Sequence, residues 1–172
     1  MEDIQNVLEL VRDRLAGFLR QTLDTTETLA VLSNLRDGDG TVPSIAENKV
    51  VLSLVNIEQS TSQSVPVRGG PPTGPGVRFP PLVLTNLYVL ILANFMGENY
   101  PTGLGLISRV IGFMQDNPVL NHSSLPGLDA AIDSLSFEFV NLDASQWSLY
   151  LKMAGATYLP AAMYRVRIAP HR

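Results

Sequence analysis

The sequence predicts an α/β fold, with α+β as the alternative, in which about three helices cover a mixed β-sheet in a single-domain sandwich. Two observations lead to this prediction. The chain has 172 residues, 45% of them hydrophobic and only 16% charged, a composition that supplies one continuous core. Segments of helical and of strand periodicity alternate along it without an internal repeat. We therefore expect residues 1–172 to form one domain.

The first part of the chain predicts a surface helix followed by strands. Apolar residues recur at helical spacing from Ile4 to Phe18, and charged residues fill the positions between them. Residues Leu29 to Leu32 predict a short strand before the turn Asp37–Gly40. From Lys49 to Glu58 aliphatic residues occupy alternate positions, which predicts a strand buried on one face and partly covered on the other.

A change of composition follows this strand. Between Pro66 and Pro81 ten of sixteen residues are Gly or Pro, too many to pack as a helix or strand. We expect a long exposed loop at about residues 60–81 that contacts a neighbouring subunit, with a disordered linker as the alternative. A phosphate-binding loop is disfavoured, because the prolines remove amide donors and no Gly-Lys-Ser/Thr ending follows.

The next segments predict a strand, a helix and a strand. The apolar stretch from Leu82 to Met96 is 15 residues long and contains polar residues, so it predicts a buried strand, Leu82–Phe95, rather than a membrane span. A second helical stripe runs from Leu104 to Met114 and ends at Asn117-Pro118, because proline cannot continue the hydrogen-bond ladder. Alternation from Leu135 to Phe139 predicts a strand with one solvent-facing side.

A third helix is marked at both of its ends. Asp143 can cap its first turn, with Gln146 in the reciprocal capping position, and Gly155 is placed to end it in the left-handed conformation. We expect Trp147 and Tyr150 to be core residues of this helix rather than a pair that stacks on a ligand.

The last segment predicts a strand from Ala162 to Ile168 in which apolar residues alternate with Arg165 and Arg167. Arginines on one face of a strand need water or acidic groups from a partner. We therefore expect this strand near an edge of the sheet.

Charge and composition disfavour several classes of function. The net charge is −4 and the basic residues are dispersed, so we expect no nucleic-acid binding. There is no cysteine, and the two histidines, His122 and His171, lie far apart, so we expect no metal site and no cofactor. The N-terminus lacks a basic start followed by an apolar run, which predicts no signal peptide, and we expect no membrane partner.

No set of residues indicates catalysis. Serines are plentiful, but no base held by a third group accompanies them, and His122 is most simply an exposed loop residue. We therefore predict no catalytic residue and no enzyme activity.

One region near the C-terminus resembles a known family, and it comprises Gln146 to Tyr150 and Met153 to Arg167. In this region a helix that contains a tryptophan leads through a turn with tyrosine and proline into a strand that ends in Tyr-Arg-Val-Arg. It resembles the N-terminal domain of cap proteins from extracellular contractile injection systems of the virulence-cassette and antifeeding-prophage type. The runs Phe79–Leu90 and Ile107–Leu120 resemble further parts of the same family, and with the first helix and the 49–59 strand the resemblance spans nearly the whole chain.

The resemblance implies a non-enzymatic structural protein, a tail terminator that forms a homo-hexameric ring on the last inner-tube and sheath layers and ends their polymerisation. It implies assembly in the cytoplasm, within a phage-tail-like particle that can be released extracellularly. Many relatives continue into arms that grip the sheath, whereas this sequence stops at Arg172. We therefore expect contact mainly with the tube, or a second cap protein as partner.

Four arginines are candidate interface residues, because they lie on features expected to meet partners: Arg68, Arg78, Arg165 and Arg167. A solvated surface is the alternative for them. Two other functions stay open: a phage-type neck or head–tail connector subunit, and a small ligand-binding or hydrolytic domain that uses the Gly/Pro loop as a lid.

Overall fold

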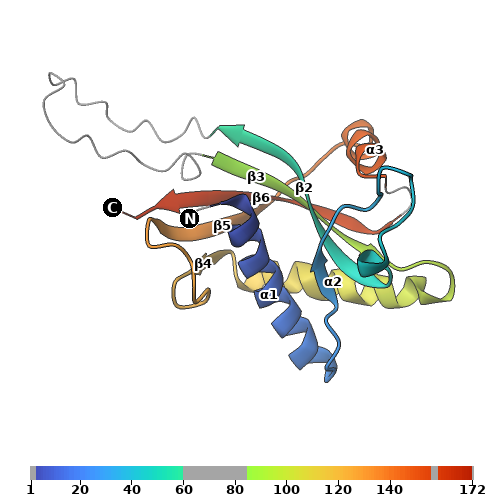
Figure 1. Ribbon diagram of the computed structural model, residues 1–172, viewed down its shortest axis with the longest axis horizontal. Coiled ribbons are helices and arrows are strands. Elements are labelled where there is room, and N and C mark those ends of the chain that lie inside the picture. The colour runs from blue at the N-terminus through green and yellow to red at the C-terminus, as the bar shows by residue number, and fades with distance from the viewer. Residues whose placement is uncertain (1–2, 60–84, 156–158, 172) are drawn as a thin grey trace, which may run out of the picture.

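The computed structural model describes residues 3–59, 85–155 and 159–171. They form a curled six-stranded sheet, three α-helices and two short 3-10 helices (Figure 1). The elements in chain order are α1 (Ile4–Leu23), β1 (Ala30–Leu32), η1 (Ser44–Ala46), β2 (Lys49–Gln59), β3 (Thr85–Asn94), η3 (Gly97–Asn99), α2 (Tyr100–Asp116), β4 (Val119–Asn121), β5 (Ile132–Phe139), α3 (Ala144–Met153) and β6 (Ala161–Pro170). The predicted mixed sheet with three helices is confirmed.

The strand order is β1-β2-β3-β6-β5-β4. Among the strands that the structure describes, β1 and β2 pair in parallel and the other pairs are antiparallel. The prediction that the last strand lies near an edge is wrong, because β6 pairs with β3 on one side and with β5 on the other. The described sheet instead ends in two strands of three residues each, β1 and β4, of which β4 was not predicted. Short edge strands limit pairing with other chains.

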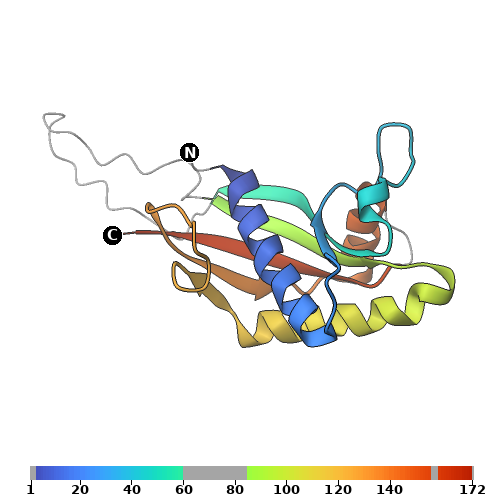
Figure 2. The ribbon, with the colours of Figure 1, turned by 60° about the horizontal axis from the view of Figure 1, so that its bottom comes forward.

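One face of the sheet packs against α1 and α2 and forms the main core (Figure 2). Alternate residues of each strand enter it, as the pleat requires. Leu15 and Leu19 of α1 and Leu52, Leu87 and Leu135 of the sheet are fully buried there. Tyr164 also lies in this core, where its hydroxyl has no hydrogen-bond partner and burial raises the pKa of the phenol to about 12.

The buried stripe of α2 agrees with the predicted one at Ile107, Val110 and Met114 and differs from it at its start. Leu104 is 42% exposed, and Gly103, Leu106 and Phe113, which were not predicted, are buried. The apolar pattern alone did not show that Gly103 lies where α2 comes closest to the end of β3. A Cβ atom at Gly103 would come within 2.9 Å of the Cβ atom of Phe95, so the absence of a side chain lets α2 pack against the end of β3.

The second face of the sheet is covered less completely. A smaller apolar cluster forms around Val51, Leu90, Leu92 and Met163, and α3 packs on it. The predicted capping box at Asp143 and Gln146 is confirmed, as is the left-handed conformation of Gly155, whose φ is +70°. No residue of α3 is fully buried, however. The expectation that Trp147 and Tyr150 are core residues therefore holds only in part, because both are half-buried at the margin of this cluster.

Candidate interaction surface

Beyond the cluster under α3, the second face of the sheet becomes polar. Two neighbouring rows of residues cross β2, β3, β6 and β5 there, and the residues paired across a row share one face. We call these eight residues the polar sheet face: Asn56, Tyr88, Arg165 and Glu138 in one row, and Glu58, Asn86, Arg167 and Ser136 in the other. The strand residues between them, such as Leu87 and Val166, point into the main core.

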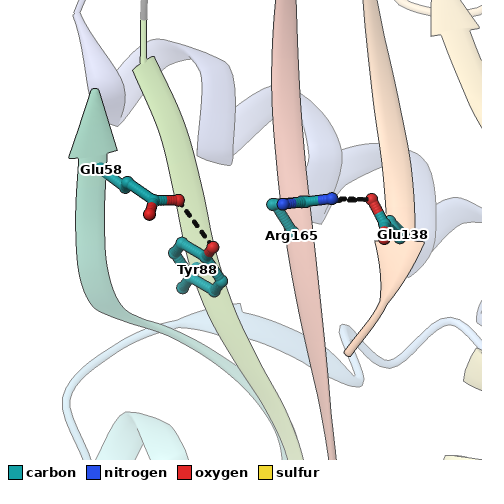
Figure 3. Close-up of polar contacts among 4 residues, drawn as sticks. All are labelled: Glu58, Tyr88, Glu138 and Arg165. Carbon is teal, nitrogen blue, oxygen red and sulfur yellow. Dashed lines mark hydrogen bonds and ion pairs between the residues drawn. The ribbon is translucent and has the colours of Figure 1, made fainter. Parts of the chain in front are cut away.

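Arg165 and Glu138 form an ion pair across β6 and β5 (Figure 3). The Nε atom of Arg165 donates to Oε2 of Glu138 at 3.1 Å, and Nη2 contacts the same oxygen. The hydrogen bond to Glu138 raises the pKa of Arg165, although burial opposes the rise. The Glu138 side chain is 59% exposed, so the pair adds little stability, about 0–1 kcal/mol.

Tyr88 and Glu58 form a second polar contact in the same part of the face. The Tyr88 hydroxyl donates to Oε2 of Glu58 at 2.7 Å. Burial, and then this hydrogen bond, raise the pKa of Tyr88, while the neighbouring Arg165 lowers it. Figure 3 shows Glu58, Tyr88, Arg165 and Glu138 in sequence across four strands, so two carboxylates flank a phenol and a guanidinium.

Arg167 and Asn86 differ from these neighbours because they keep unused hydrogen-bonding capacity. Arg167 forms no ion pair with any other residue in the described part of the chain. Asn86, its cross-strand partner on β3, is only 5% exposed, and its Oδ1 atom has no hydrogen-bond partner. Buried polar atoms without partners are uncommon, because each costs roughly 1–3 kcal/mol of free energy.

The structure thus brings two of the four predicted interface residues together. Arg165 and Arg167 lie on the same face of β6, whereas Arg68 and Arg78 lie outside the described residues, as does the predicted Gly/Pro loop. The partners Glu58, Tyr88 and Glu138 were not predicted as site residues. Alternation had placed Glu138 on a solvent-facing side of its strand, but its pairing with Arg165 depends on the register of β5 and β6.

The Asp37–Gly40 turn and His122, both noted in the sequence, make local contacts. Asp39 accepts hydrogen bonds from the Thr41 hydroxyl and amide at 2.7 and 2.9 Å, which lower the pKa of Asp39 and stabilise the predicted turn. The exposed His122 contacts the carbonyl oxygen of Ile132 at 2.7 Å. Within residues 3–59, 85–155 and 159–171 no group of three or more His, Asp or Glu could hold a metal ion. None of the described helices is long and apolar enough to cross a membrane.

A cleft of about 690 Å³ lies between β2, the end of α1 and α2. Its charged residues are Glu27, Glu47, Lys49 and Arg109, and Lys49 lies 3.8 Å from Glu27. This mixture of signs favours no single class of ligand.

Comparison with known proteins connects this fold to one family. Residues 7–171 match the family model described as the Pvc16 N-terminal domain. A similar solved structure is a chain described as the PVC sheath/tube terminator in the extended state, from an extracellular contractile injection system, with a TM-score of 0.53 and 12% sequence identity. The match covers 100% of this chain and 58% of that one. The comparison with curated protein sequences finds no match.

Proposed function

Because the chain belongs to the Pvc16 N-terminal domain family, we propose that it is a non-enzymatic terminator that caps the sheath and inner tube of a phage-tail-like contractile injection system. In this role it forms a ring at the end opposite the baseplate and stops further polymerisation. Its partners are other copies of itself, inner-tube and sheath subunits, and a second cap protein. The particle is assembled in the cytoplasm and is released from the cell.

One observation carries this proposal: the family match extends over residues 7–171, so the family's domain accounts for nearly all of these 172 residues. The fold shared with a sheath/tube terminator supports the same role. The proposal treats residues 1–172 as one cap domain and takes the ring to have six copies, the number that the resemblance to cap proteins implies.

The polar sheet face is the surface that we assign to subunit contacts. Arg167 is the cation of this face without an acidic partner in the described chain, and it lies beside Asn86, whose buried Oδ1 atom has no hydrogen-bond donor. An acidic side chain of a neighbouring subunit would pair with the Arg167 guanidinium, whereas Oδ1 of Asn86 is an acceptor and would need a hydrogen-bond donor from that subunit. Arg165 is already paired with Glu138 and holds the geometry of the face. Arg68 and Arg78 belong to the proposed interface by their place in the sequence alone.

The experiment that tests this assignment is the mass of the assembled protein, measured by light scattering or native mass spectrometry over a range of concentrations. We expect wild-type protein to form rings and Arg167→Glu to dissociate into smaller species. The matched control is Arg109→Glu, which makes the same charge change on an exposed position of α2 without an ion pair in the described residues. If both variants assemble like the wild type, Arg167 is not an interface residue; if the wild type stays monomeric with tube and sheath present, the ring itself is wrong.

A further inference from the structure

The outer edge of β2 is longer than the strand that covers it. β2 has 11 residues and β1 has three, and β1 pairs only with Val50, Val51 and Leu52. The last contact is a hydrogen bond of 3.1 Å from the Ser33 amide to the Leu52 carbonyl. From Ser53 to Gln59 no described segment pairs with this edge, although the ladder to β3 continues on the other side (Figure 1).

The register shows which backbone groups are free. The Val50 amide donates to the Leu29 carbonyl on the β1 side, so alternate residues from Val50 direct their backbone groups outward. The register shift between Leu54 and Asn56 inserts one extra residue into β2, so beyond it the residues that direct their backbone groups outward are offset by one position. The outward groups of the uncovered stretch therefore belong to Leu54, Ile57 and Gln59, which can pair with an added strand.

Side chains beside this edge offer a place for an apolar residue. A hollow of about 250 Å³ lies where β1 ends, and its apolar lining comes from Leu35, Leu54, Val55, Met153 and Ala154. Arg36 also lines it, but its guanidinium donates to the carbonyl oxygens of Gly40 and Gly155. Met153 is 66% exposed, and Ile57 farther along the strand is 50% exposed. The stretch from Ser53 to Gln59 also contains no lysine or proline, the residues that usually block pairing at an edge.

Charge indicates what kind of strand fits. Glu58 is the only charged residue between Ser53 and Gln59, and in the described chain it accepts a hydrogen bond from Tyr88 but forms no ion pair. A carboxylate on the same face of an added strand would lie next to Glu58. Like charges on neighbouring strands are destabilising, so the edge favours a basic strand.

From the free backbone groups, the hollow and the single carboxylate, we propose that the outer edge of β2 binds an extended strand of another protein, with an apolar side chain in the hollow and a lysine or arginine facing Glu58. Glu58 also belongs to the polar sheet face, but the free backbone edge is that of β2, two strands from Arg167 on β6. Binding of a strand at this edge therefore does not depend on the proposed ring.

The probe is the acetylated and amidated peptide Lys-Thr-Val-Thr-Val-Thr-Lys, which reads the same in both directions, so either strand orientation places a valine near the hollow and a lysine near Glu58. Titration of the isotope-labelled full chain, followed by NMR, reports where the peptide binds. We expect shifts at Leu54, Ile57 and Gln59 and slower amide hydrogen exchange there. A peptide with glutamate in place of both lysines should bind about fivefold more weakly.

Two controls separate strand addition from nonspecific attraction. A peptide N-methylated at alternate residues keeps its charge but loses the hydrogen bonds, and we expect it not to bind. Glu58→Gln should remove the preference for lysine, whereas Glu98→Gln, at an exposed position of η3 without an ion pair in the described residues, should leave it unchanged. The proposal is overturned if no shift appears at the β2 edge at millimolar peptide, or if the N-methylated peptide binds equally well.

Discussion

The two faces of the sheet differ in how completely their side chains are buried. On the main-core face, side chains from α1, α2 and all six described strands pack together, and residues such as Leu15, Val110 and Leu135 have no exposed surface. On the second face α3 contributes no fully buried residue, and farther along the sheet the surface becomes the polar sheet face. The difference teaches that one face supplies the stability of the fold, so the other is free to carry interactions.

The largest loss of stability should follow from Phe113→Ala in the main core. Phe113 is 2% exposed, and its ring centroid lies 4.9 Å from that of Phe18. Removing it leaves a cavity between α1 and α2, so we expect the free energy of unfolding to fall by about 4 kcal/mol. Urea denaturation measures this. A loss below about 1 kcal/mol would contradict the comparison, because Phe113 would then not be a tightly packed residue.

A smaller loss is expected from Gly103→Ala, at the contact between α2 and the end of β3. The new Cβ atom would meet the Cβ atom of Phe95, which is fixed to the backbone and cannot rotate away, so we expect a loss of about 2 kcal/mol. Gly112→Ala is the matched control in the same helix. Nothing lies within 4 Å of a Cβ atom there, so helix propensity should stabilise that variant by up to about 1 kcal/mol. Equal effects of the two changes would show that α2 does not pack on Phe95 as described.

On the second face, Trp147→Ala should cost less than a core aromatic does. Trp147 is half-buried against the second cluster, so the loss should be about 1.5 kcal/mol, well below the value for a fully buried ring. Leu149→Ala, at a position of the same helix that is 57% exposed, should change stability by less than about 0.5 kcal/mol. If Trp147→Ala were as damaging as Phe113→Ala, the two faces would contribute equally and the comparison would fail.

The smallest effect concerns the pH dependence of the cap of α3. The backbone amide of Gln146 and the hydroxyl of Ser145 donate hydrogen bonds to the Asp143 carboxylate. These bonds, the Gln146 bond most strongly, lower the pKa of the Asp143 carboxyl group. A carboxyl group whose pKa is lowered on folding stabilises the protein above its unfolded pKa of about 3.9, and this contribution disappears as the pH falls through the lower folded pKa. The stability difference between wild type and Asp143→Asn should therefore be constant near neutral pH and shrink below about pH 4. If the stability difference did not change with pH, Asp143 would not act as an ionised cap of α3.

Local signals predicted much of the fold because they act within a few residues. The capping box of α3, the end of α2 before Pro118 and the left-handed Gly155 all follow from short-range geometry, and the structure confirms them. The position of β6 was predicted wrongly because it depends on pairing between distant segments. Arginines on a strand suggested an edge, but an interior antiparallel strand can carry them when its second face is polar.

The candidate surface shows the same limit. Alternation along the last strand correctly put Arg165 and Arg167 on one face. Their neighbours could not be found in the same way, because Glu138 is 27 residues from Arg165, and Tyr88 is 30 residues from Glu58. Only the register of four strands brings these side chains into two rows.

The central claim, that this chain terminates a contractile sheath and tube, is tested most directly by electron microscopy of particles assembled with and without the protein. We predict that particles lacking it have sheath-tubes of uncontrolled length with an open end opposite the baseplate, and that the wild-type chain restores both uniform length and a closed end. Particles of unchanged length and shape that do not contain the protein would contradict the claim.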